Sequence, residues 1–150
     1  MTNVHVSNES GMPCDEAALA GLATFTITEL ALHPECELAI TLVDLERMTT
    51  LHEDWMNEPG PTDVLSFPMD EIRRPQPGEQ AEAGMLGDIV LCPSFLGPQR
   101  EASGRSLDGE LQFLVVHGMH QFIGFDHATQ EDYDAMFALQ DSLLLQWGES

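Results

Sequence analysis

Histidines gather in one short stretch of the chain, and their spacing is typical of a metal site. Three of the six histidines lie within eleven residues, in the segment HGMHQFIGFDH. His117 and His120 are one helical turn apart, so both can face one side of a helix. Gly124 stands where that helix would end, and the chain can then turn His127 back towards the first histidine. Three protein ligands leave a position on a metal ion open for water, as in catalytic sites.

The same histidines have two alternative explanations. Core or capping histidines satisfy hydrogen bonds in many buried helices, but three that converge on one turn favour a metal. A zinc peptidase of the HExxHxxGxxH type holds its ion with similar spacing. Such a peptidase needs a glutamate general base directly after the first histidine, and that residue is Gly118 here. We therefore predict a metal site and disfavour a peptidase.

Strands and helices alternate along the chain and would position these residues. Apolar alternation and β-branched runs predict strands over 2–7, 36–43, 62–67 and 86–92. Helical spacing and capping residues predict helices over 15–32, 44–56, 108–123 and 129–147. A polar, proline- and glycine-rich segment predicts a mobile loop over 70–84. The order β-α-β-α-β-β-α-α predicts one α/β (α+β) domain over 1–150, with a small mixed four-stranded sheet and helices packed on it.

The composition is acidic and is compatible with a folded, soluble protein. Lys+Arg 5 against Asp+Glu 26 gives a formal net charge of −21, and 43% of the residues are hydrophobic. No apolar stretch approaches the roughly 20 residues of a membrane span, and the N-terminal segment has no export signal. We expect a cytoplasmic protein with no membrane partner. A surface this negative repels nucleic acid at long range, so composition alone argues against an RNA or DNA partner.

Several other chemically capable residues are predicted to be structural. His52 is expected on a helix face and not among metal ligands, and Trp55 and Trp147 are expected to be core anchors. No CxxC pair exists, so the cysteines are predicted to be reduced, mostly buried thiols without a functional role. These cysteines are Cys14, Cys36 and Cys92.

Two further motifs complete a resemblance to a known family. Residues 61–68 read PTDVLSFP and residues 86–90 read LGDIV, before the histidine segment that ends at His127. With these motifs in this order over most of the chain, the sequence resembles the YbeY family of metal-dependent endoribonucleases, which are linked to 16S ribosomal RNA maturation and ribosome quality control. The resemblance implies the family's α/β fold, one Zn²⁺ ion per chain or another divalent metal, and a metal-bound water that cleaves a phosphodiester bond. It also implies ribosomal RNA and the small ribosomal subunit as partners, with no DNA.

The resemblance assigns expected roles to particular residues. Asp88 matches the aspartate of the family's LGD motif and would orient a water or a histidine, with a turn or capping role as an equal alternative. The expected catalytic residues are Asp88 and His117. The expected metal ligands are His117, His127 and His120, or Gln121 in place of His120. The expected substrate-binding residues are Thr62, Asp63, Ser66, Arg73 and Arg74, although the first three can equally serve only to end a strand.

The sequence departs from the family pattern near this site. The family's second histidine lies four residues after the first, where this chain has Gln121, and His120 stands one place earlier. His120 replaces the family ligand only if the helix shifts locally, for example by a bulge. Otherwise Gln121 offers a weaker amide oxygen, or the ion is lost. Met56 stands where the family often carries an arginine, so charge stabilisation would fall to the arginines at 73, 74, 100 or 105.

Three functions therefore compete. The first is a single-strand-specific, metal-dependent endoribonuclease of ribosomal RNA, supported by His117, His127 and Asp88. The second is a non-catalytic ribosome-associated maturation factor whose metal site is weakened or lost, favoured by the net charge of −21 and by Met56. The third is a metal-dependent hydrolase of another substrate, which depends on the predicted site alone.

Overall fold

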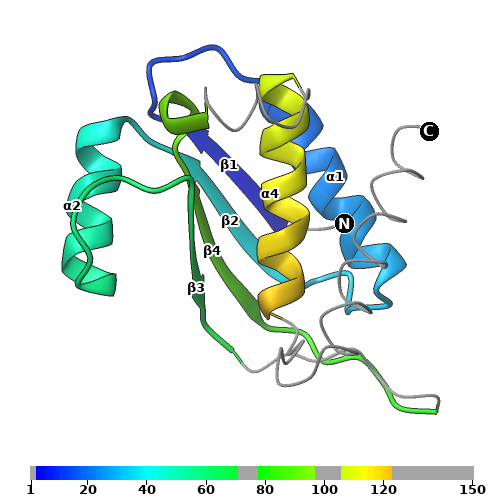
Figure 1. Ribbon diagram of the computed structural model, residues 1–150. Coiled ribbons are helices and arrows are strands. Elements are labelled where there is room, and N and C mark those ends of the chain that lie inside the picture. The colour runs from blue at the N-terminus through cyan, green and yellow to red at the C-terminus, as the bar shows by residue number, and fades with distance from the viewer. Residues whose placement is uncertain (1–2, 71–77, 97–105, 123–150) are drawn as a thin grey trace, which may run out of the picture.

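The computed structural model describes residues 3–70, 78–96 and 106–122. In this part of the chain a four-stranded sheet has helices on both faces (Figure 1). The elements are β1 (Asn3–Asn8), α1 (Glu16–Glu29), β2 (Glu37–Leu42), α2 (Leu45–Met56), β3 (Val64–Pro68), β4 (Met85–Leu91), the 3-10 turn η1 (Pro93–Leu96) and α4 (Leu107–Phe122).

The sheet is mixed, as the sequence predicted. Its strand order is β1-β2-β4-β3, with β1, β2 and β4 parallel and β3 antiparallel to β4. The predicted α/β class and the order of the elements are confirmed, and the ends of the described elements differ from the predicted ones by a few residues. Within the predicted loop, residue 70 and residues 78–84 form no helix or strand, whereas 71–77 lie outside the described residues. The predicted helix over 129–147 also lies outside them.

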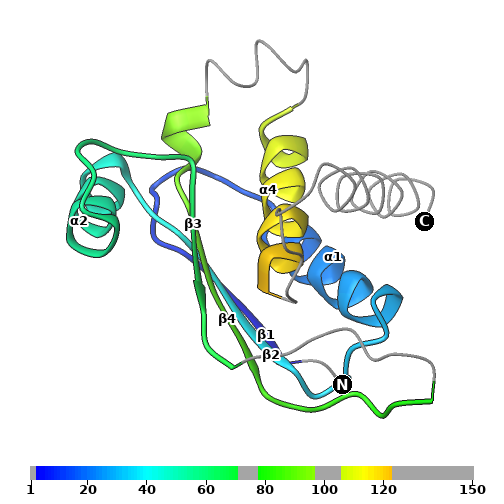
Figure 2. The ribbon, with the colours of Figure 1, turned by 60° about the horizontal axis from the view of Figure 1, so that its bottom comes forward.

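Two apolar clusters hold the layers together. The larger cluster joins α1 and α4 to one face of the sheet, to which β2 contributes Leu38, Ile40 and Leu42. The smaller cluster joins Met48 of α2 to Leu65 and other residues of the opposite face. Figures 1 and 2 show α1 and α4 on one side of the strands and α2 on the other. Among the described residues no helix is long and apolar enough to cross a membrane.

Aspartates begin the first two helices, as the capping rules predict. The side chain of Asp15 accepts a hydrogen bond from the Ala18 amide of α1, and Asp44 accepts one from the Arg47 amide of α2. Each bond satisfies an amide that has no partner within the helix. Asn57 caps the end of α2 directly after Met56, and its left-handed backbone (φ 54°) turns the chain towards β3.

A bulge in β4 changes which side chains face which layer. Glu37 pairs with Met85 while Leu38 pairs with Gly87, so Leu86 is the extra residue. Beyond the bulge the alternation is regular: Ile89 belongs to the larger cluster and Val90 to the smaller one. Asp88 is two residues before Val90, and side chains two residues apart on a strand face the same way. Asp88 therefore lies on the α2 face of the sheet.

Trp55 is not the core anchor that the sequence predicted. Its side chain is 68% exposed at the end of α2. Met48, in the first half of α2, is the buried residue of this helix, because the smaller cluster does not extend beneath its last turn. Trp55 lies beyond this buried residue and meets the sheet at Phe67, with ring centroids 5.9 Å apart and planes 73° from parallel. Trp147, the second predicted anchor, lies outside the described residues.

Candidate active site around β3, β4 and α4

Helix α4 carries His117 directly before Gly118, a residue at which the helix meets the sheet. The imidazole is half-buried and stacks on Phe113, one turn earlier, with centroids 6.3 Å apart and planes 5° from parallel. The next residue, Gly118, allows the close approach of helix and sheet. A Cβ atom there would lie 3.0 Å from both Ile89 Cδ1 and Ser66 Oγ. The absence of a side chain at Gly118 thus places His117 next to the helix face that meets Ser66 of β3.

The two positions that compete for the second ligand lie in the last turn of α4. The helix is α-helical from Leu107 to Phe122, with no π turn in this range. His120 and Gln121 therefore keep ordinary helical spacing from His117, each within about 60° of it around the axis. The local bulge that would bring His120 to the family position is absent. His127 lies outside the described residues.

The predicted ligand set stays a prediction. Among the side chains that the structure describes, no three His, Cys, Asp or Glu residues gather in a way that could hold a metal. His117 is the member of the predicted set whose side chain is described, and it is partly accessible. Imidazole nitrogens are common zinc ligands, so this donor is chemically suited to the predicted ion.

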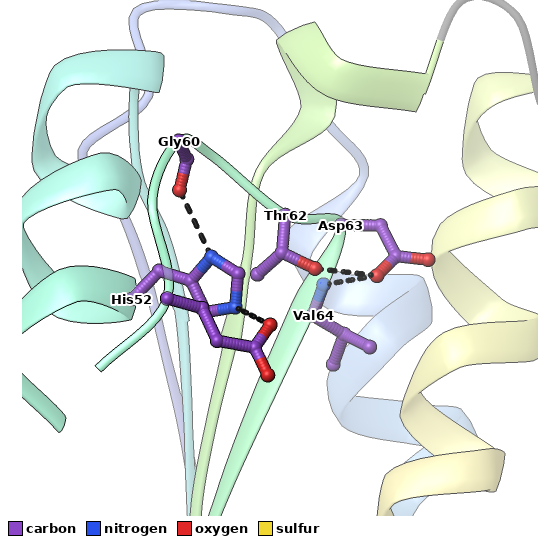
Figure 3. Close-up of polar contacts among 6 residues, drawn as sticks. His52, Gly60, Thr62, Asp63 and Val64 are labelled. Atoms are coloured by element: carbon purple, nitrogen blue, oxygen red, sulfur yellow. Dashed lines mark hydrogen bonds and ion pairs between the residues drawn. The ribbon is translucent and has the colours of Figure 1, made fainter. Parts of the chain in front are cut away.

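The start of β3 is tied down by local hydrogen bonds (Figure 3). The Asp63 carboxylate accepts from the Val64 amide at 2.8 Å and from the Thr62 hydroxyl at 3.3 Å. The Asp63 carbonyl accepts from the Cys92 amide of the neighbouring chain segment at 3.0 Å. These contacts give Asp63 a structural role at the strand end, one of the two roles that the sequence left open. A role of Thr62 or Asp63 in substrate binding stays a prediction.

His52 holds the connection between α2 and β3, a role that sequence reasoning missed. Its Nδ1 lies 2.9 Å from the Gly60 carbonyl oxygen and its Nε2 lies 3.3 Å from Glu58 Oε2 (Figure 3). Both partners are acceptors, so the imidazole lies between a backbone oxygen and a carboxylate oxygen, one at each ring nitrogen. No spacing rule in the sequence relates these three residues. The signal that could have indicated the contact is a histidine in the last turns of a helix that is followed by a Pro-Gly turn.

Ser66 of β3 and Asp88 of β4, both predicted site residues, lie on opposite faces of the sheet. Ser66 pairs with Ile89 and faces α4, whereas Phe67 pairs with Asp88 on the α2 face. Asp88 is half-buried and lies on the face opposite to that covered by the helix of His117. The structure thus brings Ser66 next to α4 and does not place Asp88 on the same face.

The position of the family arginine and the arginines predicted to bind substrate complete the list of predicted site residues. Met56, in the place of the family arginine, is 42% exposed at the end of α2. Arg73 and Arg74 lie outside the described residues.

Comparison with known proteins identifies the family. The family model for Endoribonuclease YbeY matches residues 6–148. The chain belongs to the YbeY family. Endoribonuclease YbeY of Thermobifida fusca is 49% identical, covering 99% of this chain and 96% of the relative. The protein of the same name from Cutibacterium acnes is 47% identical over 97% of this chain and 94% of the relative. These relatives are, by name, hydrolases that cut RNA internally.

A solved structure supports the fold of this YbeY family member. The solution structure of TM1509 from Thermotoga maritima superposes with a TM-score of 0.63. It covers 97% of this chain and 90% of the other at 21% identity. At that identity the likeness concerns the architecture alone.

Proposed function

We propose that this chain is a metal-dependent endoribonuclease that cleaves single-stranded RNA during 16S ribosomal RNA processing and ribosome quality control, in the cytoplasm. The observation that carries the proposal is family membership together with the histidine segment, whose first member, His117, directly precedes Gly118, the residue of α4 that meets Ser66 of the PTDVLSFP strand. Its partners would be ribosomal RNA and the small ribosomal subunit.

The ligand set supports one divalent ion, with zinc as the first choice. His117 and His127 would hold it, together with His120 or Gln121. A bound ion of this kind supplies Lewis acidity towards a phosphoryl oxygen and lowers the pKa of a coordinated water. The protein's own contribution is to hold the His117 ring, which packs on Phe113 while Gly118 seats α4 on the sheet.

One observation favours the alternative of a non-catalytic maturation factor. The backbone of α4 continues without a π turn through positions 120 and 121, which supports Gln121, four residues after His117, over His120 as the second ligand. A site that uses Gln121 has a weaker donor, since an amide oxygen is a poorer zinc ligand than imidazole. Metal affinity therefore separates the two functions.

The test combines metal content with cleavage. We expect the purified protein to contain about one zinc per chain by elemental analysis, and to cut an unstructured oligoribonucleotide. Cleavage should disappear with EDTA and in His117→Ala, and His5→Ala, an exposed residue of β1, serves as the matched control. A metal-free parent that does not cleave, beside a Gln121→His, His120→Leu double variant that binds zinc, would establish the maturation factor instead.

A further inference from the structure

An exposed aromatic ring lies against a second ring at the end of α2. The Trp55 side chain is 68% exposed, and it meets Phe67 in a near-perpendicular ring contact with centroids 5.9 Å apart. Phe67 itself packs against the smaller core cluster. Two residues further along the chain, Met69 is 58% exposed, and its amide still donates to the Leu86 carbonyl at 3.2 Å. We call Trp55 and Phe67 the Trp55 platform.

The platform lies across one strand from the candidate active site. Phe67 and Ser66 are consecutive residues of β3, so their side chains point to opposite faces. Ser66 meets α4 at Gly118, next to His117, whereas Phe67 supports Trp55. Strand β3 is the last in the order of the described sheet, so a chain of nucleotides would have to cross only this edge to reach from one face to the other.

The charge around Trp55 selects the kind of contact it can make. Its neighbours on the same face of α2, four and three residues earlier, are Leu51 and His52, whose Nε2 lies 3.3 Å from the Glu58 carboxylate. Glu53 and Asp54 point about 200° and 100° away around the helix. With a net charge of −21 the protein gains little from phosphates, whereas stacking of a neutral base on an indole needs no cation. Unpaired bases have free faces for such stacking, and duplex bases do not.

We propose that Trp55, supported by Phe67, is the stacking site for one unpaired base of the RNA substrate, adjacent to the nucleotide at His117. This inference rests on the proposed endoribonuclease function and extends it to substrate selection: the preference for single strands would come from this platform. A protein partner for the same apolar surface is the competing occupant, and the experiment distinguishes the two.

Fluorescence reports stacking directly. The chain has two tryptophans, so a Trp147→Phe background leaves Trp55 as the sole emitter. An unstructured oligoribonucleotide, added in EDTA to prevent cleavage, should quench its emission to saturation. An abasic oligomer of the same length and a duplex of the same sequence should not.

Substitutions then measure the contribution to substrate binding. Trp55→Ala should raise the Kd, and the KM of cleavage, about fivefold or more with little change in kcat, because a stacked base contributes roughly 1–3 kcal/mol. Trp55→Tyr keeps an aromatic face and should stay within about twofold of the parent. Met69→Ala is the matched control: it removes an exposed apolar side chain from the same surface without removing a ring.

The results that overturn the proposal are specific. In one such result, a filter retains RNA with the protein, but the RNA does not quench the Trp55 emission and Trp55→Ala binds RNA as tightly as the parent. The base would then lie elsewhere, and the proposed function would stand. If Trp55→Ala changes only self-association in sedimentation, the platform is a protein contact. If the parent neither binds nor cleaves RNA, both proposals fail together.

Discussion

Gly87 lies directly after the bulge in β4, at a position where the structure has no room for a side chain. Its φ of +153° lies in a region that side chains rarely adopt, and a Cβ there would collide with the Phe67 carbonyl oxygen and lie 2.9 Å from Phe122 Cζ. Because backbone and a packed ring surround the position, neither neighbour can yield cheaply. The glycine of the LGDIV motif therefore has a structural explanation that is independent of catalysis.

We expect Gly87→Ala to lower the free energy of unfolding by about 2–5 kcal/mol, as backbone strain and overpacking add. Urea denaturation monitored by circular dichroism measures this. Gly60→Ala is the control, since Gly60 also has a positive φ (+81°) but nothing within 4 Å of a Cβ. It should cost only about 1 kcal/mol. Equal losses in the two variants would contradict the packing explanation.

The cysteines offer a second test at this scale. Burial raises the pKa of the Cys36 and Cys92 thiols, and burial together with the charge of Asp108 raises that of Cys14. A raised pKa leaves less thiolate, so all three should react with a disulfide reagent more slowly than free cysteine at pH 8. Cys14 is only half-buried and should react first. Mass spectrometry of the labelled peptides checks the order.

The raised pKa values of these thiols also link stability to pH. A thiol with a raised pKa in the folded state contributes stability below its unfolded pKa, and that contribution is lost as the pH rises above about 8.5. A stability that increases from pH 8 to pH 10 would contradict it.

At the scale of elements, the connection from α2 to β3 depends on one side chain. His52 contacts both the Gly60 carbonyl and the Glu58 carboxylate, across the turn that leads to Thr62 and Asp63. Glu58 is 68% exposed, so solvent screens its ion pair, while the bond to the Gly60 carbonyl is part-buried. The backbone contact should therefore contribute more.

We expect His52→Ala to lower the free energy of unfolding by about 1–2 kcal/mol, and Glu58→Gln by less than about 0.5 kcal/mol. Thermal denaturation of the two variants side by side measures the difference. If Glu58→Gln were as damaging as His52→Ala, the ion pair and not the carbonyl bond would hold the turn.

At the scale of the whole molecule, charge sets the response to salt. With a net charge of −21 on 150 residues, the negative side chains of the folded protein repel one another. Salt shortens the range of this repulsion, from about 10 Å at 0.1 M to about 3 Å at 1 M. We expect the melting temperature to rise by several degrees between 0.05 and 1 M NaCl. The rise should shrink at pH 5, nearer the pI of about 4.1. An equal rise at both pH values would indicate a general salt effect.

Sequence reasoning predicted the elements well because their signals are local. Asp15 and Asp44 lie beside the helices that they cap, and the periodicity of each helix or strand depends on residues a few positions apart. The motifs PTDVLSFP, LGDIV and HGMHQFIGFDH predicted the family, which the comparisons confirmed. The second ligand position could not be predicted, because it depends on the pitch of α4 through residue 121.

What the sequence alone determined was the set of elements, their order and the family. Only the tertiary structure decided that Asp88 lies on the face of the sheet opposite to α4, and that Trp55 is exposed against Phe67. The physical reason is that both facts depend on residues distant in the chain. The bulge at Leu86 is defined by the pairing of β4 with β2. The exposure of Trp55 depends on how far the smaller core cluster, which includes residues of β3 and β4, extends beneath α2.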